Sequence, residues 1–531
     1  MSSTSGSGHG DDAGSVNSFH IGGSHPPVQV VSRELVSPAS PSPSDPFFLS
    51  CFDIPWQDFH YNRRLLFYKN PSRQSARESY SDVHASSLVQ SLKCSLSLCL
   101  VHYYCWSGRL SKGIDPPHRL FIDCNDAGVE FVEAFIDMPL SLFVQDGFQM
   151  KPVFNELCQT PDHRGDRLFS SPLLSIQVTL FSDGGLAVGV SQSHVVADGQ
   201  ALWDFMVSWG ECSRSVSLSK PPSHDRQRLA VPNPSLEKAQ RWVFFPDLSP
   251  DDEVTLREEA GREAMGPSKA VGKGTPSETK HSAPVDTQKR DRHIHEHEEV
   301  PDFIAGLKDD VVQWVFTLSA SALKKLKSEA GEGFTSFEVM CAHFWQRFCL
   351  ARNDLPGTCT SFFIPINCRT LLKPPLPPAY FGNVIGSRVV ASVASKIREE
   401  SLAAIASRIH SELAAFKREH MVESLMHWLE THENRIVPTL MSAPPRPPTK
   451  GLNVASSPWF PAYEVDFGWG KPDAVRAAKV PGEGEMILFG GRPGSIRGDL
   501  EICTALPQFV LQSLLQDPLF LGVSPCPSDS D

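Results

Sequence analysis

Apolar and polar residues follow one another along the chain in patterns that predict strands followed by helices. Residues 173–190, LLSIQVTLFSDGGLAVGV, form two apolar runs broken at Asp183, Gly184 and Gly185. Runs rich in β-branched residues around a short glycine-containing break predict a β-hairpin. Residues 201–215, ALWDFMVSWGECSRS, then place apolar side chains at helical spacing. This order of hairpin and helix is typical of a mixed α/β domain.

Other segments predict further elements of both kinds. Thr335 and Glu338 form a capping box that opens a helix, and residues 395–430 read as one long helical stretch. Residues 118–137 predict two short strands around a turn at 125–128. Before Gly108, apolar residues recur every three or four positions and predict one buried helix face, made of Val89, Leu92, Leu96, Cys99 and Tyr103.

A chain of 531 residues is too long for one core, so we expect two domains. Residues 1–28 are rich in Gly and Ser and predict a disordered extension. We place the first domain at 29–215, a crossover at 216–310 and the second domain at 311–531. Within the crossover, 20 of the residues 251–300 are charged and none is aromatic, which predicts a disordered insertion.

Composition narrows the possible partners and the environment of the protein. A formal net charge of −12 disfavours nucleic acid and anionic membranes, because both attract clustered basic residues. The thirteen cysteines show no CxxC pair, and the amino terminus lacks the features of a secretory signal, so we expect reduced thiols and a cytoplasmic protein. The alternating histidines of HIHEHEE, at 293–299, lack a fixed set of neighbouring ligands, and we expect no functional metal site.

The segment SQSHVVADGQ, 191–200, holds the candidate chemistry. His194 comes directly after a predicted buried strand, where an imidazole facing a cleft can act as a general base near neutral pH. Asp198 can turn back into the protein and pair with a cation, and Gly199 permits a close approach that a side chain would forbid. No evident nucleophile signature such as G-x-S-x-G accompanies the histidine. Direct attack by a base-activated substrate is therefore the simpler mechanism.

A second motif, DFGWG at 466–470, lies far downstream. H-x-x-x-D-G followed by D-F-G-W-G resembles the signature pair of the plant BAHD acyl-CoA-dependent acyltransferases. The segments IDCNDAGVEF, INCRTLLKPPLPPAYFGN and TALPQFVLQSLL resemble further blocks of this family in the same order. The resemblance runs from about residue 28 to 518, interrupted at 251–300.

The resemblance implies an α/β fold like that of chloramphenicol acetyltransferase. Two similar mixed-sheet domains would be joined by a crossover, with the active-site channel between them. It also implies acyl-CoA as co-substrate, a small-molecule acceptor, no permanently bound cofactor and a monomer.

The resemblance assigns roles to individual residues as well. His194 matches the general base, and Trp469 matches a residue whose indole N–H can stabilise the oxyanion of the tetrahedral intermediate. Asp198 matches a structural aspartate paired with an arginine at Arg369, while Asp466 and Gly468 match positions that shape their loop. Lys471, Thr335 and Ser336 match positions near CoA.

The resemblance leaves the donor and acceptor open. FDIPWQDFHYNRRLLFY and YFGN look most like the anthocyanin and phenolic glucoside acyltransferases, which favours malonyl or another aliphatic acyl group and a phenolic or its glycoside. LPPAYFGNVI also resembles hydroxycinnamoyltransferases, and Ser193 and Val384 depart from the malonyltransferase pattern. A malonyl carboxylate would need a cation, and Arg167 is the candidate. A carrier-dependent condensation domain and a non-catalytic ligand-binding member remain as alternatives.

Overall fold

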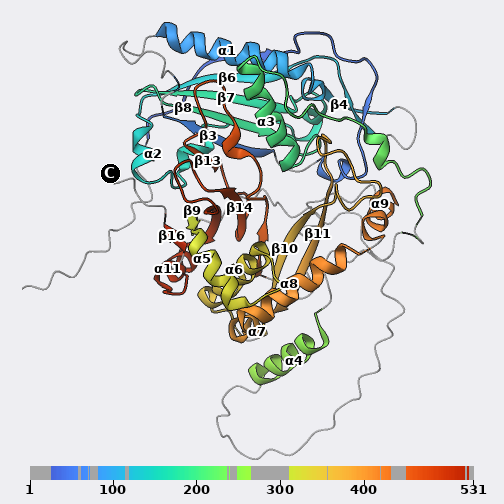
Figure 1. Cartoon of the computed structure of the whole chain (residues 1–531), viewed down its shortest axis with the longest axis vertical. Helices are drawn as coiled ribbons and strands as arrows, with labels where there is room; N and C mark the ends of the chain where they lie inside the picture. The colour runs from blue at the N-terminus through green and yellow to red at the C-terminus, as the bar shows by residue number, and fades with distance from the viewer. Residues whose placement is uncertain are drawn as a thin grey trace, which may run out of the picture.

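The computed structural model describes residues 25–57, 61–69, 71, 82–113, 119–235, 238, 248–264, 310–355, 357–418, 420–431, 450–520 and 523–525. Two mixed β-sheets, each packed against helices, form the upper and lower halves of the molecule in Figure 1. The predicted α/β fold with two mixed-sheet domains is confirmed. The residues of HIHEHEE, the extension before residue 25 and the insertion after residue 264 lie outside the described residues.

The N-terminal half contains a six-stranded sheet and a smaller three-stranded one. The order of the six strands is β1 (Gln29–Val36), β6 (Val129–Ile136), β7 (Leu174–Phe181), β8 (Leu186–Gln192), β3 (Asn62–Tyr68) and β13 (Ala474–Ala477). The small sheet has the order β2 (Phe47–Phe48), β5 (Leu120–Asp123) and β4 (Arg109–Lys112).

The C-terminal half contains one sheet of seven strands. Their order is β11 (Ile385–Val393), β10 (Cys359–Asn367), β12 (Lys450–Val454), β14 (Glu485–Gly490), β15 (Leu500–Pro507), β9 (Val311–Leu318) and β16 (Val523–Pro525). Parallel pairs occur at β6–β7, β10–β12 and β12–β14, and all other pairs are antiparallel, so both large sheets are mixed.

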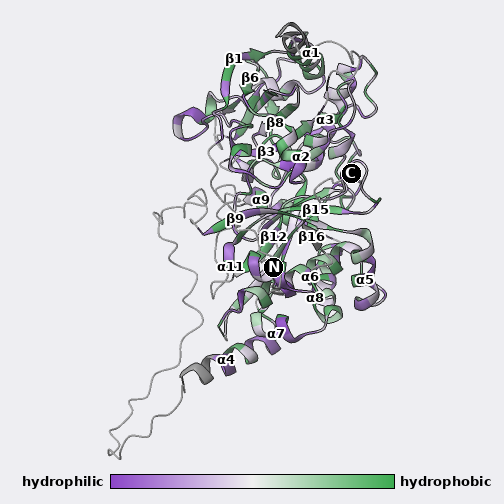
Figure 2. Cartoon of the chain, turned by 90° about the vertical axis from the view of Figure 1, so that its left-hand side faces the viewer, coloured by the Kyte–Doolittle hydropathy of each residue, from purple (hydrophilic) through white to green (hydrophobic). Residues whose placement is uncertain are grey.

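Helices cover the sheets and connect their strands. The α-helices are α1 (Asp82–Leu100), α2 (Ser141–Gln145), α3 (Gly199–Ser213), α4 (Pro250–Ala264), α5 (Ala320–Ala330), α6 (Ser336–Arg352), α7 (Ala394–Glu399), α8 (Leu402–Phe416), α9 (Met421–Thr431) and α11 (Gln508–Gln516). Short 3₁₀ turns lie at Ile54–Trp56, Tyr104–Ser107, Pro152–Asn155, Gly165–Phe169, Arg226–Leu229 and Ala462–Glu464. Hydrophobic residues gather on the strands, and hydrophilic ones on outlying helices such as α4 and α7 (Figure 2).

The predicted hairpin forms as β7 and β8, which pair antiparallel from Leu174 opposite Gln192 to Leu180 opposite Leu186. Gly184 adopts a positive φ of 82°, a conformation that favours glycine, and the Asp183 side chain accepts a hydrogen bond from the Gly185 amide. Both strands are buried along their whole length. The predicted helix face is also buried and packs in the same core as α3.

The structure corrects several expectations about local elements. The buried helix ends at Leu100 and continues only as a 3₁₀ turn, and the long helical stretch is three helices, α7, α8 and α9. The strands β5 and β6 belong to different sheets. Disorder from residue 251 is wrong for α4, because buried Asp252 binds Lys396 at 2.9 Å and Arg408 at 3.1 Å and so fastens this helix to the C-terminal half.

The predicted domain boundaries also miss an exchange between the halves. Strand β13 belongs to the C-terminal part of the sequence, yet it pairs antiparallel with β3 and completes the N-terminal sheet. Along the described ranges, no helix is long and apolar enough to cross a membrane. All twelve cysteines in the described part of the chain are free.

Candidate active site

His194 lies just beyond the end of β8, where the chain turns before entering α3. Its side chain is 6% exposed, and its ring stacks on Trp56 with the ring centroids 3.8 Å apart and the planes 10° from parallel. Trp56 ends the short 3₁₀ turn at Ile54–Trp56, on a segment remote from His194 in sequence. The imidazole is therefore held in one orientation by an aromatic surface.

Asn383 fixes the tautomer of His194. The amide nitrogen of Asn383 donates to the His194 carbonyl oxygen at 2.8 Å and to Asp53 Oδ1 at 2.9 Å. The amide oxygen is then the acceptor that faces His194 Nδ1, at 3.1 Å. Nδ1 must carry the proton in this bond, so the lone pair of the neutral ring is on Nε2.

Asp53 anchors Asn383 in turn. Asp53 is fully buried, and its carboxylate also accepts bonds from the Ser50 amide at 2.8 Å and from Arg226 Nε at 3.0 Å. Asp53, Trp56 and Asn383 lie in segments that support the family resemblance, but the sequence alone assigns them no role. Their only signal was their place in FDIPW and YFGN, because each reaches His194 through the fold and not through spacing.

Burial controls the charge of His194. Loss of solvent lowers the pKa of His194 to about 4, although the bond to Asn383 and the charge of Asp198 act in the opposite direction. The ring is therefore neutral near pH 7, which is the form that can accept a proton.

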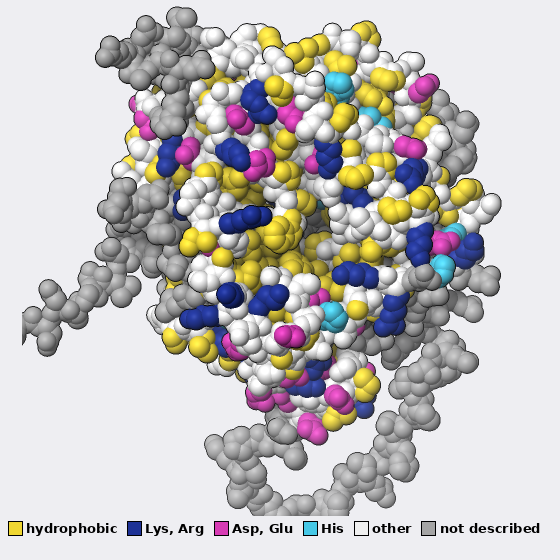
Figure 3. All heavy atoms as spheres, viewed as in Figure 1, with side chains coloured by type: hydrophobic (Ala, Val, Ile, Leu, Met, Phe, Trp, Pro, Cys, Tyr) yellow, Lys and Arg dark blue, Asp and Glu magenta, His cyan; other side chains and the backbone are white. Residues whose placement is uncertain are grey.

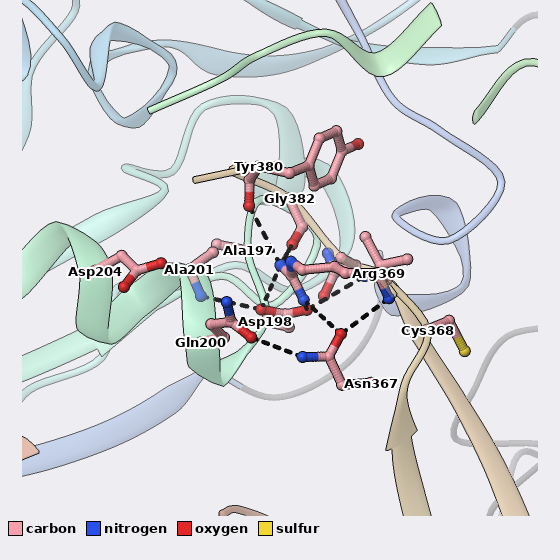
Figure 4. Close-up of polar contacts among 12 residues, drawn as sticks. Ala197, Asp198, Gln200, Ala201, Asp204, Asn367, Cys368, Arg369, Tyr380 and Gly382 are labelled. Carbon is pink, nitrogen blue, oxygen red and sulfur yellow. Dashed lines mark hydrogen bonds and ion pairs between the residues drawn. The ribbon is translucent and has the colours of Figure 1, made fainter. Parts of the chain in front are cut away.

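Asp198 and Arg369 form the ion pair that the family resemblance implies (Figure 4). Arg369 Nη1 and Nη2 donate to the two carboxylate oxygens at 2.7 and 3.0 Å, and both side chains are almost fully buried. Asp198 also caps α3 by accepting from the Ala201 amide at 3.0 Å, and it accepts from the Val384 amide at 3.2 Å. This aspartate thus joins the loop after His194 to the segment between β10 and β11.

A cavity of about 750 Å³ adjoins His194, a size typical of ligand sites. Its wall contains four large aromatic side chains, from Trp203, Phe337, Trp459 and Phe460. Phe460 approaches the α3 N-terminus so closely that a Cβ on Gly199 would lie 2.7 Å from its ring, which explains the glycine. Figure 3 shows a hollow between the two halves, lined by hydrophobic side chains and rimmed by Lys and Arg.

The DFGWG loop lies far from His194. Ser213, the last residue of α3, donates to the Phe467 carbonyl at 2.8 Å, whereas Asp198 caps the first turn of the same helix. A 15-residue helix is about 20 Å long, so the loop and His194 lie at opposite ends of α3. The Trp469 ring contacts Tyr68, which pairs with Leu186 at the other end of β8. The geometry is therefore incompatible with the predicted oxyanion role of Trp469.

Inside this loop, Asp466 acts as expected of a residue that shapes the chain. Its Oδ1 accepts from the amides of Gly468 at 2.8 Å and Gly470 at 2.9 Å. Gly468 and Gly470 have φ values of 112° and 106°, which favour glycine.

The residues predicted to bind CoA are spread over separate places. Lys471 forms an ion pair with Glu464 at 2.7 Å and does not line the cavity beside His194. The Thr335 hydroxyl accepts from the Glu338 amide and caps α6. Ser336 is next to Phe337, which does line the cavity. The exposed guanidinium of Arg167 pairs with Asp162 and is likewise outside the cavity wall.

Comparison with known proteins places this chain in a family. A family model described as the Transferase family matches residues 26–521. The chain belongs to this family of BAHD acyltransferases. It is therefore an enzyme that transfers acyl groups.

Similar BAHD proteins include BAHD acyltransferase DCR of Arabidopsis thaliana, 29% identical over 93% of this chain and 92% of the relative. Shikimate O-hydroxycinnamoyltransferase of Nicotiana tabacum is 27% identical over 87% and 93%. Among solved structures, vinorine synthase has a TM-score of 0.61 at 20% identity, with 92% of this chain and 96% of that chain covered. The F. sporotrichioides TRI101 complex with coenzyme A and T-2 has a TM-score of 0.62 at 16% identity, covering 90% and 98%. These structures share the fold.

Proposed function

We propose that this BAHD acyltransferase moves an acyl group from acyl-CoA to a hydroxyl of a small acceptor, with His194 as general base. The observation that carries the proposal is the commitment of His194 Nδ1 to Asn383, which leaves the lone pair on Nε2 of a neutral, buried imidazole beside a ligand-sized cavity. This is the arrangement a base needs to take a proton from a bound hydroxyl.

The reaction follows from that arrangement. Nε2 accepts the hydroxyl proton while the acceptor oxygen attacks the thioester carbonyl carbon. The tetrahedral intermediate then collapses, the C–S bond breaks, and the CoA sulfur takes the proton back from the imidazolium. Asn383 and Trp56 keep the ring oriented through both proton transfers, and Asp198 holds the loop without touching the reacting atoms.

For CoA, the first turn of α6 is the better supported of the predicted contacts. Ser336 opens a 17-residue helix, whose N-terminal amides favour phosphate, and the adjoining Phe337 is part of the cavity wall. Lys220 is the lysine in the wall itself, and it is paired with Asp204 at 2.6 Å. We therefore assign the phosphate contacts to Ser336 and Lys220 in preference to Lys471.

The acyl group that suits the cavity is aromatic. Trp203, Phe337, Trp459 and Phe460 offer ring surfaces on which a planar group can stack. Several similar proteins are named hydroxycinnamoyltransferases, from Nicotiana, Narcissus and Oryza. We therefore favour a hydroxycinnamoyl donor over the malonyl donor that the sequence blocks suggest.

A free-thiol release assay tests the function. Purified protein is offered p-coumaroyl-, caffeoyl-, malonyl- and acetyl-CoA with a set of phenolic, glycosidic and hydroxy-acid acceptors. We expect release that depends on acceptor and is greatest with the aromatic thioesters. His194→Ala should abolish it, whereas His343→Ala, which removes another buried histidine with a pKa near 4, should not. Undiminished release in His194→Ala would refute the proposal.

A further inference from the structure

Arg64 is a buried arginine in the wall of the cavity that contains His194. It lies on β3, is 8% exposed, and lines the cavity together with Asn62 of the same strand. The mechanism proposed above gives it no role. A guanidinium is always charged in a protein, so its burial beside a substrate cavity needs a physical explanation.

Other buried arginines of this protein have a carboxylate partner. Arg226 is paired with Asp53 at 3.0 Å, Arg369 with Asp198 at 2.7 Å, and Arg476 with Glu501 at 2.9 Å. Arg64 has no carboxylate within 4.0 Å in the described part of the chain. Its guanidinium there makes one hydrogen bond, from Nη1 to the Arg63 carbonyl oxygen at 2.9 Å.

The acidic side chain that acts most on Arg64 is Glu485, at the start of β14 in the C-terminal half. Burial raises the pKa of Glu485 to about 7, against the opposite influence of Arg64. Glu485 is therefore protonated in a large part of the molecules near neutral pH, and it forms no ion pair with Arg64 within 4.0 Å. The charge of Arg64 is not compensated by a close partner from the described protein.

We propose that Arg64 binds a carboxylate of the substrate in the active-site cavity. A ligand carboxylate would supply the anion that a planar guanidinium accepts through two parallel hydrogen bonds. The inference rests on the proposed function and deepens it, because it makes a carboxylate a specificity element of the same site. It also replaces Arg167, which is outside the cavity wall, as the cation expected from sequence.

Two substrates could carry this carboxylate. The acceptor can be a hydroxy acid, as in the names of three similar proteins, which mention shikimate, piscidic acid and 5-hydroxyanthranilate. Alternatively, the acyl group can be that of a dicarboxylic acid, such as malonyl. The same guanidinium would serve both, so the two sources are separated by experiment.

The first arm compares shikimate with methyl shikimate as acceptor for p-coumaroyl-CoA. The second compares malonyl-CoA with acetyl-CoA and one phenolic glucoside as acceptor. In the arm that carries the natural carboxylate, Arg64→Gln should raise KM for the acid by roughly 10- to 100-fold and change that of the neutral analogue less than about 3-fold. Arg64→Lys should raise KM for the acid by an intermediate factor, because lysine keeps the charge but cannot form two parallel hydrogen bonds. Arg167→Gln is the matched control and should change KM neither for the acid nor for its neutral analogue.

Direct binding separates this inference from the reaction. Titration of wild type with shikimate and with malonyl-CoA, followed by calorimetry, needs no turnover. Binding that weakens in Arg64→Gln supports the role of Arg64 even if no acyl transfer is detected, which would count against the proposed function alone. The carboxylate role of Arg64 would be overturned if Arg64→Gln lowered kcat equally with acids and with their neutral analogues. It would also be overturned if the wild type bound shikimate no better than methyl shikimate and malonyl-CoA no better than acetyl-CoA. The wild-type comparison holds even if Arg64 variants fail to fold.

Discussion

Neutralising Asp198 should destabilise the protein far more than a surface change would. Asp198→Asn keeps an oxygen that can cap α3 but removes the charge that Arg369 contacts at 2.7 and 3.0 Å. Both side chains of the pair are less than 5% exposed, so the guanidinium would stay buried without its partner. Breaking such a pair on one side costs about 3–5 kcal/mol. For a domain of 150–250 residues this corresponds to a Tm lower by about 6–20 °C.

Arg369→Met should lower the free energy of unfolding less than Asp198→Asn does. The double variant should lower it by less than the sum of the two single losses. In Arg369→Met, the backbone amides of Ala201 and Val384 still donate to the Asp198 carboxylate. The double variant leaves no unpaired ion, because both charges are gone. We therefore expect its loss of stability to be smaller than the sum of the two single losses by about 2 kcal/mol or more. Differential scanning calorimetry of the four proteins measures this. Additive losses, or a loss below about 1 kcal/mol in Asp198→Asn, would refute the reasoning.

Two further predictions concern His194 and Trp469. Burial lowers the pKa of His194 to about 4, and the base works only when it is unprotonated. We therefore expect kcat/KM to stay level from about pH 5.5 to 7 and to fall as the pH drops through about 4. A fall of kcat/KM centred near the ordinary histidine pKa of 6.5 would contradict this. Trp469→Phe keeps an aromatic ring against Tyr68 and should leave kcat within about 3-fold of wild type, because the residue lies far from His194. Removal of an oxyanion donor lowers kcat by about 10²–10³-fold. A loss of that size in a folded variant would show that Trp469 is catalytic after all.

The sequence predicted the elements whose signals are local. The hairpin of β7 and β8, the capping box of α6 and the apolar face of α1 follow from spacing that each segment contains. The predicted end of the first helix and the single helix over residues 395–430 were wrong; between α7 and α8 the apolar periodicity is interrupted by Ser401, which caps α8 by accepting from the Ala404 amide. The helix α4 was missed because its stability comes from contacts of Asp252 with a distant surface.

In the candidate site, motif resemblance placed His194 and paired Asp198 with Arg369. It could not place Trp469, because two motifs that are characteristic of one family need not meet in space, and here α3 separates them. Asn383 and Trp56 contact His194 from segments on either side of it in the sequence. Arg64 differs from the other buried arginines only in having no carboxylate partner in the described part of the chain. Such features depend on three-dimensional neighbours, which a single sequence does not contain.

Strand β13 has a consequence for any attempt to divide this enzyme. The N-terminal residues alone would leave the edge of β3 unpaired, a long and largely apolar edge of the kind that drives aggregation. A C-terminal fragment would carry β13 without its partner. Split proteins and domain exchanges between relatives should therefore fail when the chain is divided at the crossover, unless β13 is included with the first half. The same strand also ties together the two halves that bound the cavity, because a segment of the C-terminal sequence is hydrogen-bonded into the N-terminal sheet.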